Sequence, residues 1–210
     1  MQPFSTLRGA AAPLALDNVD TDLIIRIERL TSLQRAELGP WAFEALRYRA
    51  DGSEDPAFVL NQPCWRDAPI LVAGRNFGCG SSREGAVWAL LARGIRCVMA
   101  ESFGDIFHAN CFQNGVLPIR LDASDLAVVH AACAPGAQWT VDLQAQAIAA
   151  PGGAVLNFEV DPLRRAALLE GLDDIGRTLK LQGAIDAWQA ADKVARPWVW
   201  PAAAAAIAQP

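Results

Sequence analysis

The sequence predicts an α/β fold with a mainly parallel central sheet, flanking helices and a small antiparallel β element. Residues 69–73 form a short apolar run of strand length, and the Ala/Leu-rich residues 85–92, which follow a glycine-rich turn, are typical of a helix. Strand and helix alternate again over residues 95–119, and strands joined in this way form parallel layers. Residues 139–143 and 155–160 are predicted to be antiparallel strands, because the second alternates apolar and polar side chains.

Local start and stop signals place the other elements in order. Gly94 ends the first helix, and residues 95–100 and 116–119 form the second and third strands. Ser102–Asp105 is expected to cap the helix between those strands, which Gly115 closes. Further helices are expected at residues 31–49, 124–132, 162–170 and 173–196.

Composition bounds the domain count and the kind of partner. The 210 residues, 52% of them hydrophobic and 20% charged, suit a single domain at residues 1–200, followed by an alanine-rich low-complexity tail at 201–210. A net charge of −5 without a basic cluster argues against nucleic-acid binding. No apolar run has the length of a membrane span, and residues 1–5 lack the features of a signal peptide, so we expect a cytoplasmic protein.

The five cysteines are dispersed, and no C-x-x-C or C-x-x-H pair occurs. An odd, scattered set suits reduced thiols in a reducing compartment. We therefore expect this chain to hold neither a zinc ion nor an iron–sulfur cluster by itself. Asp17–Asp22 carries three aspartates, which suit either a metal ion or a turn and helix cap, and we favour the turn and cap.

The segment Gly74–Glu84 is the predicted active site. It links a strand to a helix through a glycine-rich turn, a layout that directs backbone N–H groups and a positive helix end toward an anion. Ser81, Ser82 and Arg83 present two hydroxyls and a guanidinium at the start of the helix. The alternative is structural, because Ser81 and Glu84 fit a capping box. The turn matches neither of the glycine-rich nucleotide motifs nor the serine-hydrolase elbow.

Several motifs together resemble one family. Residues 18–22, 76–84, 102–107, 110–119 and 171–176 are similar to the small subunits of 3-isopropylmalate dehydratase, which are in turn similar to the swivelling domain of aconitases. The resemblance extends over nearly the whole chain and implies a swivelling β/β/α domain.

The resemblance also implies a reaction and a division of labour. Members of the family isomerise 2-isopropylmalate to 3-isopropylmalate in leucine biosynthesis, by removing water and adding it back. A large subunit holds a [4Fe–4S] cluster that acts as a Lewis acid, and the two chains form a heterodimer or heterotetramer. By position, Ser81 matches the catalytic base, and Ser82 and Arg83 match residues that bind the dicarboxylate substrate.

Two positions depart from the family pattern. Gly85 stands where the family usually has histidine, and Val87 where proline is frequent. The role of that histidine is absent here, which bears on substrate preference more than on reaction type. A sister hydro-lyase, such as homoaconitase or a citraconate or methylmaleate hydratase, is therefore an alternative. A free-standing anion-binding module without catalysis is a second one.

The resemblance places residues 26–31 in a loop that faces the variable substituent of the substrate. Leu30 and Ile27 suit an isopropyl group, whereas Arg29 or Arg26 suits a third carboxylate. Glu28 is close enough in sequence to neutralise one of the arginines. We expect Leu30 to form the isopropyl pocket and Arg29 to contribute to substrate binding only if the substrate is a tricarboxylate.

Overall fold

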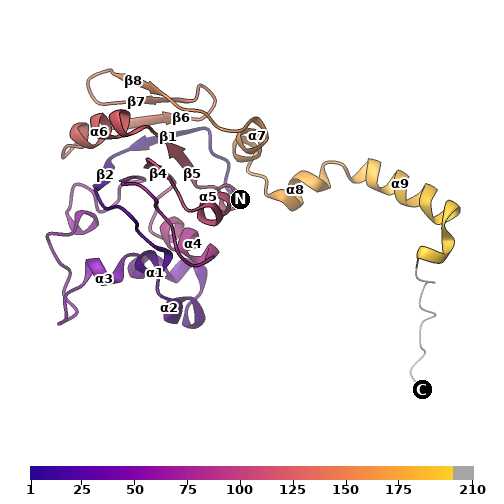
Figure 1. Cartoon of the computed structure of the whole chain (residues 1–210), viewed down its shortest axis with the longest axis horizontal. Helices are drawn as coiled ribbons and strands as arrows, with labels where there is room; N and C mark the ends of the chain where they lie inside the picture. The colour runs from indigo at the N-terminus through magenta and orange to yellow at the C-terminus, as the bar shows by residue number, and fades with distance from the viewer. Residues whose placement is uncertain (201–210) are drawn as a thin grey trace. The chain divides into compact units, whose positions relative to one another are not determined.

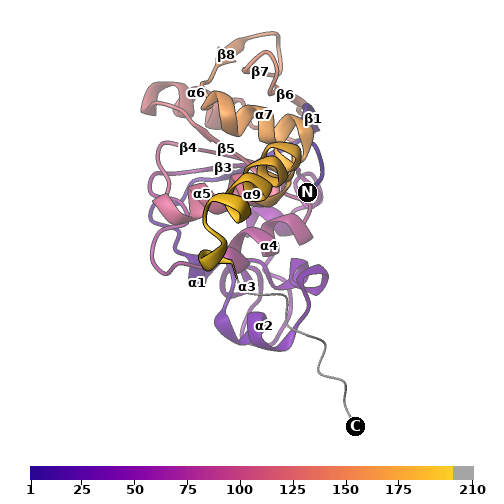
Figure 2. The same ribbon diagram turned by 90° about the vertical axis from the view of Figure 1, so that its right-hand side faces the viewer.

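The structure, a computed structural model, describes residues 1–200; the predicted low-complexity tail lies outside these residues. The described chain forms two compact units, the first of them Met1–Asp173 and the second beginning at Asp174. Both sheets belong to the first unit, in which Figures 1 and 2 show them as neighbouring layers. The boundary of a single domain at residue 200 stays a prediction.

The predicted parallel sheet is confirmed and has four strands in the order β2-β3-β4-β5. Every neighbouring pair is parallel, with Ile70 opposite Ala11 on one side and opposite Cys97 on the other. The strand β2 was not predicted, because its four residues carry a proline and two alanines and become a strand only by pairing with β3. The strands are β2 (Ala11–Leu14), β3 (Ile70–Ala73), β4 (Cys97–Ala100) and β5 (Leu117–Arg120).

The antiparallel element is larger than predicted, with four strands in the order β1-β6-β7-β8. The two predicted strands, β6 and β8, do not pair with each other, since β7 lies between them. The three residues of β7 are too short and too alanine-rich to be recognised from sequence. The strands are β1 (Thr6–Gly9), β6 (Trp139–Asp142), β7 (Ala147–Ala149) and β8 (Val155–Asn157).

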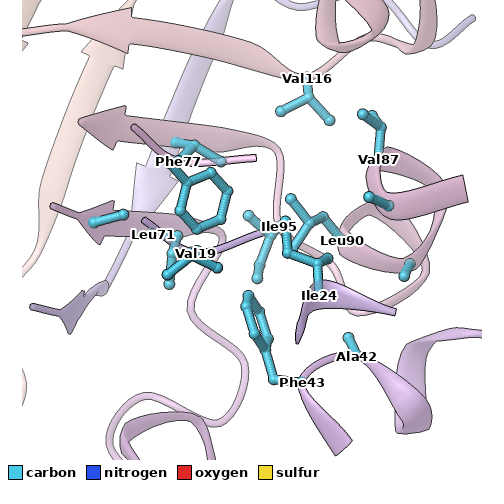
Figure 3. Packing of buried hydrophobic residues seen from close by; sticks show 14 of the residues in the cluster. Val19, Ile24, Ala42, Phe43, Leu71, Phe77, Val87, Leu90, Ile95 and Val116 are labelled. Atoms are coloured by element: carbon cyan, nitrogen blue, oxygen red, sulfur yellow. The ribbon is translucent and has the colours of Figure 1, made fainter. Parts of the chain in front are cut away.

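Alternation along the parallel strands creates two cores and three layers. Ile70 and Val72 of β3 pack with residues of the antiparallel sheet, such as Trp139. Leu71 and Ala73 point the other way and join the core under the helices, where Figure 3 shows Leu71 beside Phe77 and Val19. The order is antiparallel sheet, parallel sheet, helices, which confirms the β/β/α arrangement.

Four helices of the first unit agree with the sequence. They are α4 (Glu84–Ala92), α5 (Asp105–Asn114), α6 (Ala123–Ala132) and α7 (Pro162–Glu170). Gly115 closes α5 with a left-handed φ of 86°, as predicted. The N-cap of α5 is Gly104, however, and the Ser102 hydroxyl instead accepts a hydrogen bond from the Asn76 amide.

Two long helices predicted from periodicity are broken. The prediction of one helix over residues 31–49 is wrong, because Gly39-Pro40 interrupts the segment and Phe43 adopts a left-handed φ of 59°. The segment 173–196 divides in two near Leu181. The short elements are α1 (Thr21–Ile24), α2 (Ile27–Ser32), η1 (Arg35–Glu37), η2 (Gly39–Trp41), α3 (Glu44–Arg47), η3 (Val59–Asn61), α8 (Asp174–Leu179), α9 (Gln182–Ala195) and η4 (Pro197–Val199). In the described chain, no helix is long and apolar enough to cross a membrane.

Candidate active site

Three loops meet at the carboxyl edge of the parallel sheet. Residues 17–22 follow β2, residues 74–83 follow β3, and residues 101–104 follow β4. These three strands are neighbours, so their carboxyl ends lie side by side, where ligands bind in open α/β sheets. We call residues 74–83 the serine loop and residues 17–22 the aspartate segment. The family motifs, although far apart in sequence, are therefore adjacent in the fold.

The serine loop has a backbone that requires its glycines. Gly78 and Gly80 have φ values of 71° and 84°, in the left-handed region, and Asn76 joins them at 56°. A side chain at Gly78 would also collide with the ring of Phe107 on α5. The loop is therefore shaped by conformations and close contacts that most residues do not allow.

The aspartate segment runs beside the serine loop and is hydrogen-bonded to it along its length. The Gly78 amide donates to the carbonyl of Val19 at 2.7 Å, and the Thr21 amide donates to the carbonyl of Cys79 at 3.0 Å. Asp17 accepts a hydrogen bond from the Arg75 amide at 2.9 Å. On the other side, the Phe77 amide donates to the carbonyl of Ser102 at 3.0 Å. The serine loop is thus held between its two neighbours.

Ser81 does not cap the helix, so the capping-box interpretation is wrong. Helix α4 begins at Glu84, and its N-cap is Arg83, which makes no side-chain capping bond. The Glu84 carboxylate accepts a hydrogen bond from the Asn114 side chain at 2.8 Å instead of returning to Ser81. Within the described chain, the hydroxyls of Ser81 and Ser82 have no hydrogen-bond partner, and both residues are exposed. These hydroxyls are available for a substrate.

Arg83 points toward the aspartate segment and forms an ion pair with Asp22 through Nη1. Its side chain is only 19% exposed, whereas that of Asp22 is 53% exposed. A guanidinium has five N–H donors, so one pairing leaves Nε and Nη2 for a second carboxylate. Arg83 is therefore oriented before any substrate binds.

The two predicted specificity residues, Arg29 and Leu30, face different surroundings. Both lie on α2, so the predicted loop is a short helix. The Arg29 Nε is 2.8 Å from the Glu44 carboxylate, and its guanidinium lies over the Trp41 ring at 3.5 Å from the centroid. Leu30 packs against Gly85 at the start of α4. Only Leu30 is therefore directed toward the helix that the serine loop precedes.

Glu44, and not Glu28, pairs with Arg29 on α2 and with Arg26 at its N-cap. Its carboxylate lies 3.3 Å from Arg26 Nε as well as against Arg29, and its side chain is only 10% exposed. These residues line a cavity of about 630 Å³ whose wall does not include Leu30. Sequence offers no signal for this partner, because Glu44 lies on a separate element, α3.

The aspartate segment forms a helix cap and ion pairs, and the cap agrees with the predicted turn and cap. Asp20 is the N-cap of α1 and accepts a hydrogen bond from the Leu23 amide at 2.7 Å. Asp17 forms an ion pair with Arg75 at 3.0 Å. Asp22 forms one with Arg83. Each carboxylate is thus used by a different partner, and the described residues contain no group of three or more His, Cys, Asp or Glu side chains suited to a metal.

The cysteines do not fit an iron–sulfur cluster. A cluster needs several cysteine thiolates close together, and the described residues contain no group of three or more His, Cys, Asp or Glu side chains that could hold one. Burial also raises the pKa of the Cys97 and Cys111 thiols. Cys97 lies in the core. Burial also raises the pKa of Cys133 to about 11. No step of the chemistry is therefore assigned to a cluster held by this chain.

Comparison with known proteins identifies the family. The aconitase C-terminal domain family matches residues 1–124, and a second family, described as LeuD_N, matches residues 130–162. The chain is 54% identical over 200 residues to a 3-isopropylmalate dehydratase small subunit from Rhodopseudomonas palustris, covering 94% of this chain and 100% of the relative. It is 52% identical over 201 residues to the small subunit of that name from Azorhizobium caulinodans, covering 95% and 100%.

A solved structure agrees in fold. The 3-isopropylmalate dehydratase (leuD) of Methanocaldococcus jannaschii is similar with a TM-score of 0.64 and 28% sequence identity, covering 88% of this chain and 99% of that one. The sequence, the order of the motifs and the β/β/α layers therefore lead to one conclusion. This chain belongs to the family of 3-isopropylmalate dehydratase small subunits.

Proposed function

We propose that this chain is the small subunit of a hydro-lyase that converts 2-isopropylmalate to 3-isopropylmalate in leucine biosynthesis. The observation that carries the proposal is the serine loop, in which the hydroxyls of Ser81 and Ser82 have no hydrogen-bond partner among the described residues and the next residue, Arg83, is oriented by Asp22. The likeness to curated small subunits supports the choice of substrate.

In the proposed mechanism, Ser81 is the base. Its Oγ, as an alkoxide, takes the proton from the substrate carbon next to the hydroxyl-bearing one, a double bond forms, and the hydroxyl leaves as hydroxide, so that the proton on Oγ and the hydroxide together account for one water. The reverse steps add water with the hydroxyl and hydrogen exchanged. Ser82 and Arg83 bind a substrate carboxylate, for which the planar guanidinium is suited.

The alkoxide form of a serine must be stabilised by its surroundings, because a serine hydroxyl does not ionise at neutral pH unaided. A helix N-terminus contributes at most about 2 kcal/mol, which corresponds to a roughly 30-fold increase in the acid dissociation constant of the serine hydroxyl. This increase is too small to ionise a serine at neutral pH. Arg83 adds a positive charge close by, and the backbone N–H groups of the turn add donors. Both act more strongly when water is excluded.

We infer that the large subunit supplies this exclusion. Ser81 and Ser82 are exposed in this chain, so a second surface must cover them for the charge on Oγ to be stabilised. We also place the [4Fe–4S] cluster on that subunit, because the described residues of this chain bring together no group of three or more side chains suited to hold it. The subunits would form a heterodimer or heterotetramer. The five free cysteines favour the reducing cytoplasm.

The test uses the purified chain, its cluster-bearing large subunit and the mixture. We expect turnover of 2-isopropylmalate only in the mixture, and a loss of several orders of magnitude in kcat for Ser81→Ala. Because Ser81 is not an N-cap, this variant should unfold within about 0.5 kcal/mol of the unmodified chain. Hydratase activity of the chain alone, or near-normal turnover by Ser81→Ala, would overturn the proposal. A panel containing homocitrate, citraconate and a methylated maleate distinguishes the sister enzymes.

A further inference from the structure

The contact between Thr21 and Ser81 joins two loops that are 60 residues apart in the chain. The Thr21 hydroxyl donates a hydrogen bond to the Ser81 carbonyl oxygen at 2.9 Å. Thr21 is 1% exposed, and only Arg47 and Asn61 share its class of buried polar side chain among the described residues. Removing the Thr21 hydroxyl would leave the Ser81 carbonyl oxygen without its hydrogen-bond donor, and a polar group left unpaired away from water costs free energy.

Thr21 holds the serine loop at two points. Its backbone amide donates to the Cys79 carbonyl at 3.0 Å, and its hydroxyl donates to the Ser81 carbonyl. Between these points lies Gly80, whose φ of 84° belongs to the permissive left-handed region. Glycine has the greatest backbone freedom of any residue, so the two bonds restrict the part of the loop that is otherwise least constrained.

Asp22 makes the adjacent connection to the same loop. It follows Thr21 on α1, a helix whose start is set by the Asp20 cap, and it forms an ion pair with Arg83. One short helix thus contacts both the backbone that carries the Ser81 hydroxyl and the guanidinium of Arg83. Among residues 1–200, the Ser81 hydroxyl itself has no hydrogen-bond partner and stays available for chemistry.

We propose that Thr21 is a positioning residue that holds Ser81 Oγ in line with the substrate proton, and that Asp22 does the same for the Arg83 guanidinium. The inference rests on the proposed function, because it needs Ser81 to act as a base. Proton transfer depends steeply on geometry, and a displacement of about 1 Å costs on the order of 100-fold in rate. Thr21 therefore acts on kcat through Ser81 without touching the substrate.

The experiment compares Thr21→Val, which keeps the shape and removes the hydroxyl, with Thr21→Ser, which keeps the hydroxyl. Each variant is assembled with the large subunit, and kcat and KM are measured with 2-isopropylmalate. We expect Thr21→Val to lower kcat about 10–100-fold with KM changed by less than about threefold, and Thr21→Ser to restore kcat to within about threefold. Asp22→Asn should instead raise KM and lower kcat together, because Arg83 holds the substrate carboxylate.

Two controls separate positioning from stability. Thr178→Val removes a hydroxyl that also donates to a backbone carbonyl at 2.9 Å, but within α8, and should leave kcat unchanged. Val129→Ala opens the core beside α6 and lowers the melting temperature without contacting the serine loop. Val129→Ala and Thr21→Val are compared at temperatures equally far below their melting temperatures. If Val129→Ala then lost as much kcat as Thr21→Val, reduced stability would explain the effect and the proposal would be overturned.

Ser81→Ala distinguishes a failure of the positioning role of Thr21 from a failure of the proposed base. If Ser81→Ala is inactive and Thr21→Val turns over normally, the positioning role is wrong and the proposed base is unaffected. If Ser81→Ala turns over normally, the proposed base itself is wrong. In the Ser81→Ala background, Thr21→Val should lower the residual rate no further, because the residues act as a unit. A further drop of tenfold or more would show that Thr21 acts by another route.

Discussion

The side chain of Leu30 occupies the space that a side chain at Gly85 would need. Its Cδ2 and Cδ1 atoms lie 2.5 and 2.6 Å from the position of a Cβ on Gly85, far inside van der Waals contact. Gly85 is buried in the first turn of α4, and Leu30 projects from α2. The glycine that departs from the family pattern is therefore paired with a leucine that fills its place.

The first prediction is that substitutions at these two positions are coupled. In the unmodified chain, Gly85→Ala forces Leu30 to move, at an overpacking cost of about 1–3 kcal/mol, partly offset by the helix propensity of alanine, about 1 kcal/mol. In the Leu30→Ala background the clash is gone, and Gly85→Ala should stabilise the chain. Urea unfolding of both single variants and the double variant measures the coupling. Equal effects of Gly85→Ala in both backgrounds would contradict the contact.

The second prediction concerns Arg83. Because its guanidinium is held by Asp22 and is proposed to bind a substrate carboxylate in both ground and transition states, Arg83→Ala should raise KM and lower kcat. Arg83→Lys should rescue poorly, since an ammonium cannot both pair with Asp22 and reproduce the planar fork. Steady-state kinetics of the assembled complex provides the measurement. Full rescue by lysine would mean that only diffuse positive charge is needed.

The third prediction separates the two specificity residues. Arg29 is already paired with Glu44, so Arg29→Ala should change kcat/KM for 2-isopropylmalate by less than about threefold. If Leu30 forms the isopropyl pocket, Leu30→Ala should cost about 1–3 kcal/mol in kcat/KM, which is the usual worth of apolar pocket contacts. The reverse pattern, in which Arg29→Ala abolishes activity and Leu30→Ala is tolerated, would favour a tricarboxylate substrate.

The fourth prediction concerns stability in acid. Burial, with the nearby Arg120 and Arg164, lowers the pKa of His108 from 6.5 to about 4, and Asp105 opposes the shift. Between these values the unfolded chain binds a proton that the folded chain does not, so stability falls as the pH falls from 6.5 to 4. The full difference corresponds to about 3 kcal/mol, and partial exposure reduces it to about 1–2 kcal/mol.

His108→Gln should flatten this part of the stability curve, measured by urea unfolding at intervals between pH 4 and 7. His130→Gln is the matched control, because burial also lowers the pKa of His130, whereas no arginine contributes to that shift. Its curve should keep most of the slope. An unchanged slope for His108→Gln would show that other groups carry the acid response.

The local pattern was sufficient to locate the candidate site but not to assign its contacts. A strand of apolar residues, a turn rich in glycine and an Ala/Leu helix are short-range signals, and they placed Ser81, Ser82 and Arg83 at the joint between β3 and α4. The same local view produced the capping box at Ser81, which is wrong. Whether a hydroxyl caps a helix depends on where the helix begins, and boundaries are the least certain part of a pattern.

The sequence by itself determined three of the four parallel strands, β3 to β5, and the helices α4 to α7, because hydrophobic periodicity and glycine stops act over a few residues. Only the tertiary structure decided which distant groups meet. Thr21 donates to the Ser81 carbonyl, Glu44 pairs with Arg29, and Leu30 occupies the space that a side chain at Gly85 would need. Each contact joins residues on separate elements that only the packed fold brings together, and such packing has no signature in a local window.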